Sequence, residues 1–135
     1  MKLPPYAELL GLMVEPGPEL VDAGPPVLMM PFVNQVTGRP GFLHGGAIGG
    51  LLEMAAIASL QHALEAEGAS QAGAKIKPIN VTVDFMRSGR DKETRALGIV
   101  TRLGTRVANV EAHAWQDDRD RPIASARMNY LIVRP

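Results

Sequence analysis

The second half of the chain alternates between apolar and polar residues in four successive runs. The first run places apolar and polar side chains in turn, as Ile79, Asn80, Val81, Thr82, Val83, Asp84 and Phe85. This period of two is typical of a half-buried β-strand. Three more strands are predicted at 95–103, 108–115 and 123–133, each after a short polar turn. Strands joined by hairpin-length loops predict an antiparallel sheet.

Upstream of these strands, residues 45–60 have a different pattern and read GGAIGGLLEMAAIASL. Glu53 is the only ionisable residue in this segment, and Ser59 is the only other polar one. A helix that is apolar on every side is buried on every side. We therefore predict a central helix from Gly45 to Leu60 that the sheet covers.

Two predicted strands each carry a distinct face. The strand at 95–103 carries Leu97, Ile99 and Leu103 on one face. The strand at 108–115 has a face of small residues, namely Ala108, Val110, Ala112 and Ala114. Small side chains leave room for a bulky neighbour, so the central helix is expected to pack there. In the first forty residues, loops rich in proline and glycine separate a short helix at 6–13 from a strand at 27–33.

Composition limits the classes of function. The 135 residues, 46% of them hydrophobic, suit one domain at 1–135 with a sizeable core. Fourteen basic residues balance fourteen acidic ones, so no basic field recruits nucleic acid or a membrane surface. The absence of cysteine excludes disulfides, a thiolate nucleophile and cysteine-based zinc sites. Because Pro4 and Pro5 interrupt the start and no apolar run spans a bilayer, we expect a soluble cytoplasmic protein.

Glu53 and the glycines before it are the candidate chemistry. A buried carboxylate is costly unless its pKa shifts, it accepts hydrogen bonds, or it faces a cleft; an ion pair at a rim or with a partner subunit is the alternative. Gly46, Gly49 and Gly50 share a helix face with Glu53. Glycine costs about 1 kcal/mol in a helix interior, so this face must approach something closely. A ligand groove and a packed neighbouring helix remain open as explanations.

The start of the helix offers a second candidate site. Gly45 and Gly46 would present backbone N–H groups at the positive end of the helix dipole, where an oxyanion could bind. His44 either caps this loop or transfers a proton. Eight residues of helix put Gly45 and Glu53 about 12 Å apart, so one carbonyl cannot touch both. If both residues act on one substrate, Glu53 comes from a second copy across a two-fold axis.

Residues 41–48, GFLHGGAI, followed by Leu51, Leu52 and Glu53, resemble the signature of the PaaI-like (phenylacetate-pathway) hotdog thioesterases. In that family an HGG turn opens the central helix and an acidic residue lies nine positions after the histidine. The resemblance implies an α+β hotdog fold, in which an antiparallel sheet wraps around one long central helix. It also implies homodimers, often paired into dimers of dimers, and no metal or redox cofactor, with coenzyme A entering only as part of an acyl-CoA substrate.

The same resemblance assigns roles to residues. Gly45 would donate its N–H to the oxyanion, and Glu53 of the other subunit would act as base or nucleophile. The further candidates are His44 and Asn34 for catalysis, and Gly46, Gly49, Thr82, Arg87, Arg90 and Arg106 for substrate binding. Asn34 lies ten residues before His44, whereas many members place an asparagine only a few residues before it. The arginines would meet the phosphates of coenzyme A, or they are ordinary solvated turn residues.

Two other functions remain open on the same fold. The displacement of Asn34 is compatible with a non-catalytic protein that binds an acyl ligand. A dehydratase would need a histidine and an acid facing one carbon, and His44 and Glu53 could be recruited across a dimer. The Asp-x-Asn-x-x-His pattern of such enzymes is missing from the sequence, and the HGG spacing favours the thioesterase.

Overall fold

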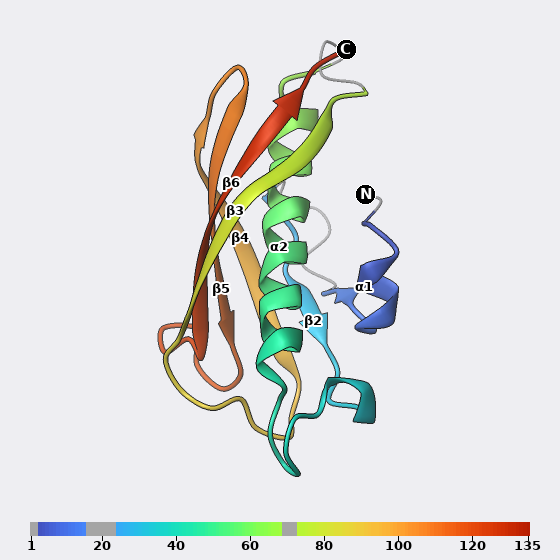
Figure 1. Ribbon diagram of the computed structural model, residues 1–135, viewed down its shortest axis with the longest axis vertical. Helices are drawn as coiled ribbons and strands as arrows, with labels where there is room; N and C mark the ends of the chain where they lie inside the picture. The colour runs from blue at the N-terminus through green and yellow to red at the C-terminus, as the bar shows by residue number, and fades with distance from the viewer. Residues whose placement is uncertain (1–2, 16–23, 69–72) are drawn as a thin grey trace.

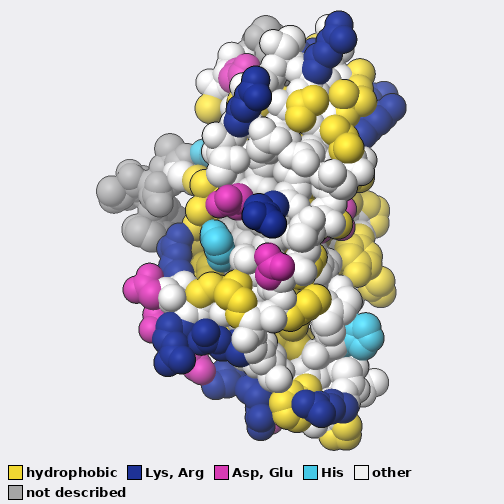
Figure 2. All heavy atoms as spheres, turned by 60° about the vertical axis from the view of Figure 1, so that its left-hand side comes forward, with side chains coloured by type: hydrophobic (Ala, Val, Ile, Leu, Met, Phe, Trp, Pro, Cys, Tyr) yellow, Lys and Arg dark blue, Asp and Glu magenta, His cyan; other side chains and the backbone are white. Residues whose placement is uncertain are grey.

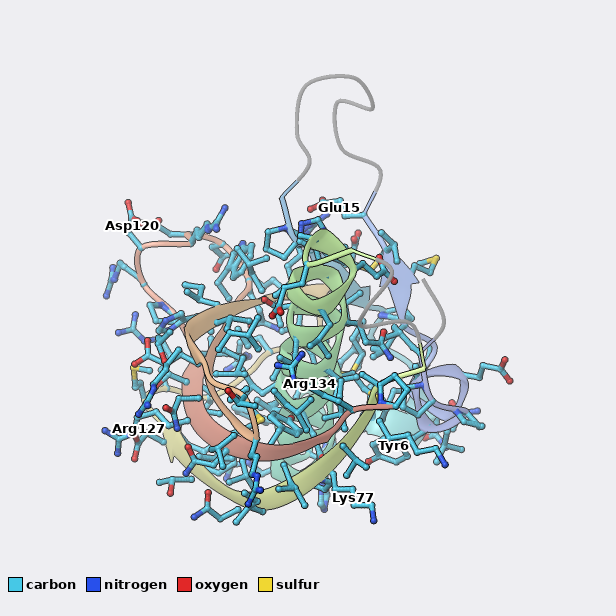
Figure 3. All side chains as sticks on the ribbon, turned by 90° about the horizontal axis from the view of Figure 1, so that it is seen from above. Tyr6, Glu15, Lys77, Asp120, Arg127 and Arg134 are labelled. Carbon is cyan, nitrogen blue, oxygen red and sulfur yellow. The ribbon has the colours of Figure 1, made fainter. Side chains whose placement is uncertain are left out.

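One long helix lies inside a curved sheet of six strands. The computed structural model describes residues 3–15, 24–68 and 73–135. The helix is α2, Gly45–Ala66, and every strand pair is antiparallel, in the order β1-β2-β4-β5-β6-β3. The strands are β1 (Met13–Val14), β2 (Leu28–Met30), β3 (Lys75–Phe85), β4 (Thr94–Leu103), β5 (Val107–Trp115) and β6 (Ala124–Val133). The predicted architecture, a sheet wrapped around one helix, is confirmed (Figures 1 and 3).

The contact between α2 and the middle of the sheet depends on small residues. The alanine face predicted for β5 is buried beneath α2, with Ala108, Ala112 and Ala114 completely covered. On β4, a Cβ atom built at Gly98 would lie 2.5 Å from the carbonyl oxygen of Ala55 in α2. The helix backbone therefore rests almost directly on the strand.

The face predicted for β4 is wrong. Leu97 and Ile99 lie on the outer surface of the sheet, and Ile99 is 43% exposed. Gly98, one residue out of phase with them, faces α2 instead. A register shift between Val100 and Arg102 then turns Leu103 back toward the core. A bulge reverses which alternate residues point inward, and the polar pattern alone did not locate it.

The alternation predicted for β3 exists, but the burial inferred from it is wrong for a single chain. Val83 pairs with the buried Ala126 of β6, which places it on the helix side of the sheet. On the same side Val81 and Phe85 remain 50% and 57% exposed. Ile79 is also exposed, at the point where the register shifts. The reason is that β3 is the last strand of the sheet and has a neighbour on one side only.

The N-terminal segment covers the side of α2 that the sheet leaves open (Figure 3). The helix predicted at 6–13 is shorter, since α1 spans Tyr6–Leu9 and Gly11 then adopts a φ of +69°. Its last predicted residue, Met13, belongs to β1 instead, which pairs with β2. The strand predicted at 27–33 is confirmed in part as β2.

The central helix begins at Gly45 as predicted, but it continues to Ala66, six residues beyond the predicted end at Leu60. Alanine, leucine and glutamate in this last stretch favour the helix, and Gly68, with a φ of +95°, follows its end. Among the described residues, α2 is the one helix long and apolar enough to cross a bilayer, and 67% of that apolar window is buried inside the protein.

A prediction for stability follows from the contact at Gly98. Gly98→Ala would press a methyl group against the Ala55 carbonyl, so we expect the free energy of unfolding to fall by about 1–3 kcal/mol. Arg102→Ala, at an exposed position of the same strand, should change it by no more than about 0.5 kcal/mol. Urea denaturation of both variants measures the difference, and equal stabilities would show that α2 can move away from β4 without cost.

Candidate active site at the start of the central helix

His44 is the N-cap of α2. Its backbone is extended, with φ −71° and ψ 134°, and its Nδ1 accepts the Gly46 N–H at 2.9 Å. An accepting Nδ1 carries no proton, so the proton of the neutral ring is on Nε2. The loop is also fixed from behind, because the His44 N–H donates to the Val36 carbonyl at 2.8 Å. Of the two roles open for His44, capping is the one its hydrogen bonds perform.

This cap leaves one amide of the first turn unused. The Gly46 N–H is taken by His44, and the N–H groups of Ala47 and Ile48 donate to the His44 carbonyl at 3.0 and 3.2 Å. Within the described part of the chain, the Gly45 N–H donates to nothing. Gly45 is exposed and lines a pocket of about 370 Å³. A single free donor therefore belongs to a pocket-lining residue at the positive end of the helix.

Glu53 lies on the one stripe of α2 that is only half-buried. Gly49, Glu53 and Ile57 follow one another at intervals of four residues and all three are partly exposed. In the described ranges the Glu53 carboxylate accepts no hydrogen bond and forms no ion pair. The rim ion pair considered from the sequence is thus not made among the residues that the structure describes. The Glu53 side chain is partly exposed to solvent instead.

The glycines of this face have different neighbours. A Cβ built at Gly50 would lie 2.8 Å from the ring of Tyr6, so this glycine lets α1 pack against α2. A Cβ at Gly46 would meet the His44 ring at 2.9 Å. At Gly49 nothing lies within 4 Å. Helix packing explains Gly50, whereas Gly49 keeps the approach to Glu53 open.

Tyr130 of β6 is a neighbour of Glu53 that the sequence did not single out. Burial raises the pKa of its phenol, and the nearby Glu53 carboxylate raises that pKa further. Tyr130 therefore stays neutral, and its hydroxyl lies 3.1 Å from the Met128 sulfur. It lines a pocket of about 440 Å³ together with Ile57, one helical turn beyond Glu53. This pocket has a mixed lining that includes Gln61 and Glu65 as well as Ile57 and Leu64, and Glu53 is not among its lining residues.

Two of the three predicted arginines lie near Gly45. Arg87 lines the same pocket as Gly45, and Arg90 lies over Phe42, another lining residue. Arg106 belongs to the β4–β5 hairpin, at the opposite end of the sheet from the start of α2 (Figure 1). A single chain therefore does not bring Arg106 to Gly45.

Asn34 and Thr82 also lie away from Gly45. Asn34 is an exposed residue in the short 3-10 helix Asn34–Val36, and the next residue, Gln35, is the one that lines a pocket of about 310 Å³ with His44. Gln35 was not predicted from the sequence as a neighbour of His44. Its position next to Asn34 is the one signal for it in the sequence. Thr82 pairs with Arg127 on the outer face of the sheet, which points away from α2 (Figure 3).

No group of three His, Asp or Glu side chains that could hold a metal ion occurs in residues 3–15, 24–68 or 73–135. The chemistry available near α2 is therefore a free amide, a carboxylate and a capped imidazole. The length of α2 keeps the amide and the carboxylate about 12 Å apart in one chain.

A test of His44 separates the cap from proton transfer. His44→Ala removes the acceptor for the Gly46 N–H, and we expect a loss of about 1 kcal/mol in the free energy of unfolding. His44→Asn keeps an acceptor at the cap and should retain most of that stability in urea denaturation. If His44→Asn folded as well as the parent but lost turnover of its substrate, the imidazole would have a chemical role beyond the cap.

Comparison with known proteins agrees with this geometry. A protein from Chromobacterium violaceum is 33% identical, with a TM-score of 0.70 over 96% of this chain and 83% of that one. A putative thioesterase from Ralstonia eutropha, a phenylacetic acid degradation-related protein, is 21% identical with a TM-score of 0.74, covering 97% of this chain and 92% of that one. A thioesterase from Haemophilus influenzae is 15% identical, also with a TM-score of 0.74, over 96% and 82%. The last two show the fold alone.

No curated protein matches the chain. The family model described as thioesterase superfamily matches residues 40–123, which include both the cap at His44 and Glu53. The predicted hotdog fold is confirmed, and the family match agrees with the predicted resemblance to thioesterases. This chain belongs to the thioesterase superfamily.

Proposed function

We propose that the protein hydrolyses an acyl-CoA thioester, with the Gly45 N–H binding the oxyanion and Glu53 as base or nucleophile. The observation that carries this proposal is the Gly45 amide, which alone among the amides of 45–48 has no acceptor. Gly45 lines a pocket at the positive end of α2. Membership of the thioesterase superfamily supports the reaction class.

Two mechanisms of thioester hydrolysis are open to Glu53, one as a general base and one as a nucleophile. As a base, the carboxylate takes a proton from water while the water oxygen attacks the thioester carbon, and the tetrahedral oxyanion then collapses to the free acid and expels coenzyme A thiolate. As a nucleophile, the carboxylate attacks that carbon itself, expels the thiolate and forms an anhydride that water opens. Both routes need an ionised carboxylate, and both build negative charge on the carbonyl oxygen at Gly45.

The proposed site takes its two halves from two chains. Gly45 and Glu53 of one helix are about 12 Å apart, so a second α2 running in the opposite direction must supply the carboxylate. The unpaired edge of β3 supports such a dimer, because Val81 and Phe85 expose apolar surface there. The Phe85 ring also lies beside Gly45, 3.6 Å from where a Cβ would be. We further propose a cytoplasmic dimer of dimers with no redox or metal cofactor.

A non-catalytic acyl-CoA-binding protein is the second candidate. The observation that favours it is the exposed position of Asn34, whose side chain is not among those lining the pockets near Gly45. Release of free thiol from aliphatic and aromatic acyl-CoAs decides between the two functions. Binding without any release would support the second.

Glu53→Gln tests the carboxylate with almost no change in shape. We expect kcat to fall at least about 100-fold, because a neutral amide can neither accept a proton nor attack the thioester. Glu111→Gln, on the outer face of the sheet, is the matched control and should retain full turnover. Thiol release from acyl-CoA measures both. Unchanged turnover by folded Glu53→Gln would contradict the role proposed for this residue.

Gly45→Pro tests the amide and the shared site together. Proline deletes the N–H yet suits the first position of a helix, and the extended His44 before it is compatible with a following proline. We expect kcat to fall about 100-fold or more, as for loss of an oxyanion donor elsewhere.

Mixed dimers then distinguish a shared site from one within a single chain. A dimer of one Glu53→Gln chain and one Gly45→Pro chain retains one complete site only if each site combines two chains. We therefore expect refolding the two inactive variants together to restore thiol release. A mixture that stayed inactive although light scattering and differential tags showed mixed dimers would place both residues in the same chain's site.

A further inference from the structure

The outer face of the sheet is polar in its middle and apolar toward one end. Its outward side chains lie opposite one another across β5 and β6 in four rows: His113 and Ser125, Glu111 and Arg127, Asn109 and Asn129, and Val107 and Leu131. Val107 and Leu131 are 40% and 37% exposed. Figure 2 shows acidic, basic and histidine side chains close together near the middle of this face, with hydrophobic side chains above them. Apolar side chains beside a polar patch are a common composition of surfaces that bind another protein.

Glu111 and Arg127 are neighbours that do not pair with each other. They lie directly opposite each other on β5 and β6. In the part of the chain that the structure describes, however, neither side chain has an oppositely charged group within 4.0 Å. Arg127 points away from α2 on the outside of the sheet (Figure 3). Both charges are therefore available to a partner.

Two hollows lie on either side of this charged row. One, of about 280 Å³, is lined by Asn80, Asn109 and Asn129, and the other, of about 200 Å³, is lined by Ser125. The three asparagines form a chain of hydrogen bonds across three strands. The Asn109 amide donates to Asn129, and the Asn129 amide donates to Asn80 at 2.8 Å. The polar middle of the face is thus ordered before any partner binds.

The rows of this face are complementary to the same rows of a second copy. A two-fold axis in the interface, parallel to the strands and midway between β5 and β6, places β5 of one chain over β6 of the other. Glu111 of each copy then faces Arg127 of the other, so the charged row forms two ion pairs. By the same operation the apolar row covers itself, and the small Ser125 receives the larger His113 over its hollow. Aligned packing of this kind is a common arrangement of two sheets.

We propose that two copies of the protein bind each other through the outer faces of β5 and β6, and that this contact joins the two dimers of the proposed dimer of dimers. It rests on the dimer proposed at the β3 edge, which is a separate surface of the chain. The contact places the two sheets back to back and turns α2 of every chain outward (Figure 3). Gly45 and Glu53 therefore stay accessible to substrate in the full assembly.

Charge reversal on either side of the row tests this contact. Arg127→Glu alone and Glu111→Arg alone each place like charges opposite each other in both halves of the interface. We expect the dissociation constant between dimers to rise at least about 100-fold, because like charges repel across a close contact. Light scattering after size-exclusion chromatography measures the mass, which should fall from four chains to two.

Mixing the two variants gives a result that misfolded protein cannot give. Dimers of Arg127→Glu carry only acids in this row and dimers of Glu111→Arg carry only bases, so the two surfaces are complementary. We expect the mixture to form tetramers with two chains of each variant, which native mass spectrometry resolves. Glu8→Arg, the same change of charge on α1 across the helix from this face, is the control and should stay a tetramer like the parent.

Three outcomes overturn the proposal. A parent that remains a dimer at every concentration measured would show that the outer face binds no second copy. Single variants that remain tetramers would place the contact on another surface. Dimers of the two variants that fail to combine would show that Glu111 and Arg127 do not face each other.

None of these outcomes depends on thiol release, so the interface and the proposed reaction can fail separately. A parent that forms these tetramers but releases no thiol contradicts the thioesterase reaction and leaves the interface supported. A parent that releases thiol as a dimer supports the reaction and overturns the interface.

Discussion

The close contact between α2 and the sheet is the constraint on which the rest of the molecule depends. Gly98 in β4 and the alanines of β5 bring the helix backbone against the strands, and this contact fixes the position of the helix axis. Once the axis is fixed, so are the direction of the first-turn amides and the stripe that carries Glu53. A bulkier residue at position 98 would displace both halves of the proposed site together.

The sequence was sufficient for the architecture because the patterns that determine it are local. The apolar helix starting at Gly45 and the strands with a period of two were recognisable without any knowledge of their neighbours. The errors came from long-range effects. The bulge after Val100 places Leu103 on the opposite face of β4 from Leu97 and Ile99, and the position of β3 at the edge of the sheet left Val81 and Phe85 exposed. Neither effect is encoded in the alternation itself.

In the candidate site, too, the residues set by local sequence were predictable and those supplied by distant elements were not. His44, Gly45 and Glu53 lie within one helix and the residue before it, so their spacing along the chain also gives their arrangement in space. Residues supplied by other elements were harder to infer. Thr82 is one residue out of phase with the helix-facing side of β3, and its pairing with Arg127 places it on the outer face of the sheet.

The open edge of β3 has a consequence for the protein at low abundance. An unpaired edge strand with apolar side chains is a surface that other strands can join, so a lone chain is exposed to association with the wrong partner. Self-pairing at this edge would protect the chain and complete the proposed site in one step. Specific activity would then rise with protein concentration until the concentration exceeds the dissociation constant of the dimer. The same concentration would separate single chains with an exposed β3 edge from active dimers.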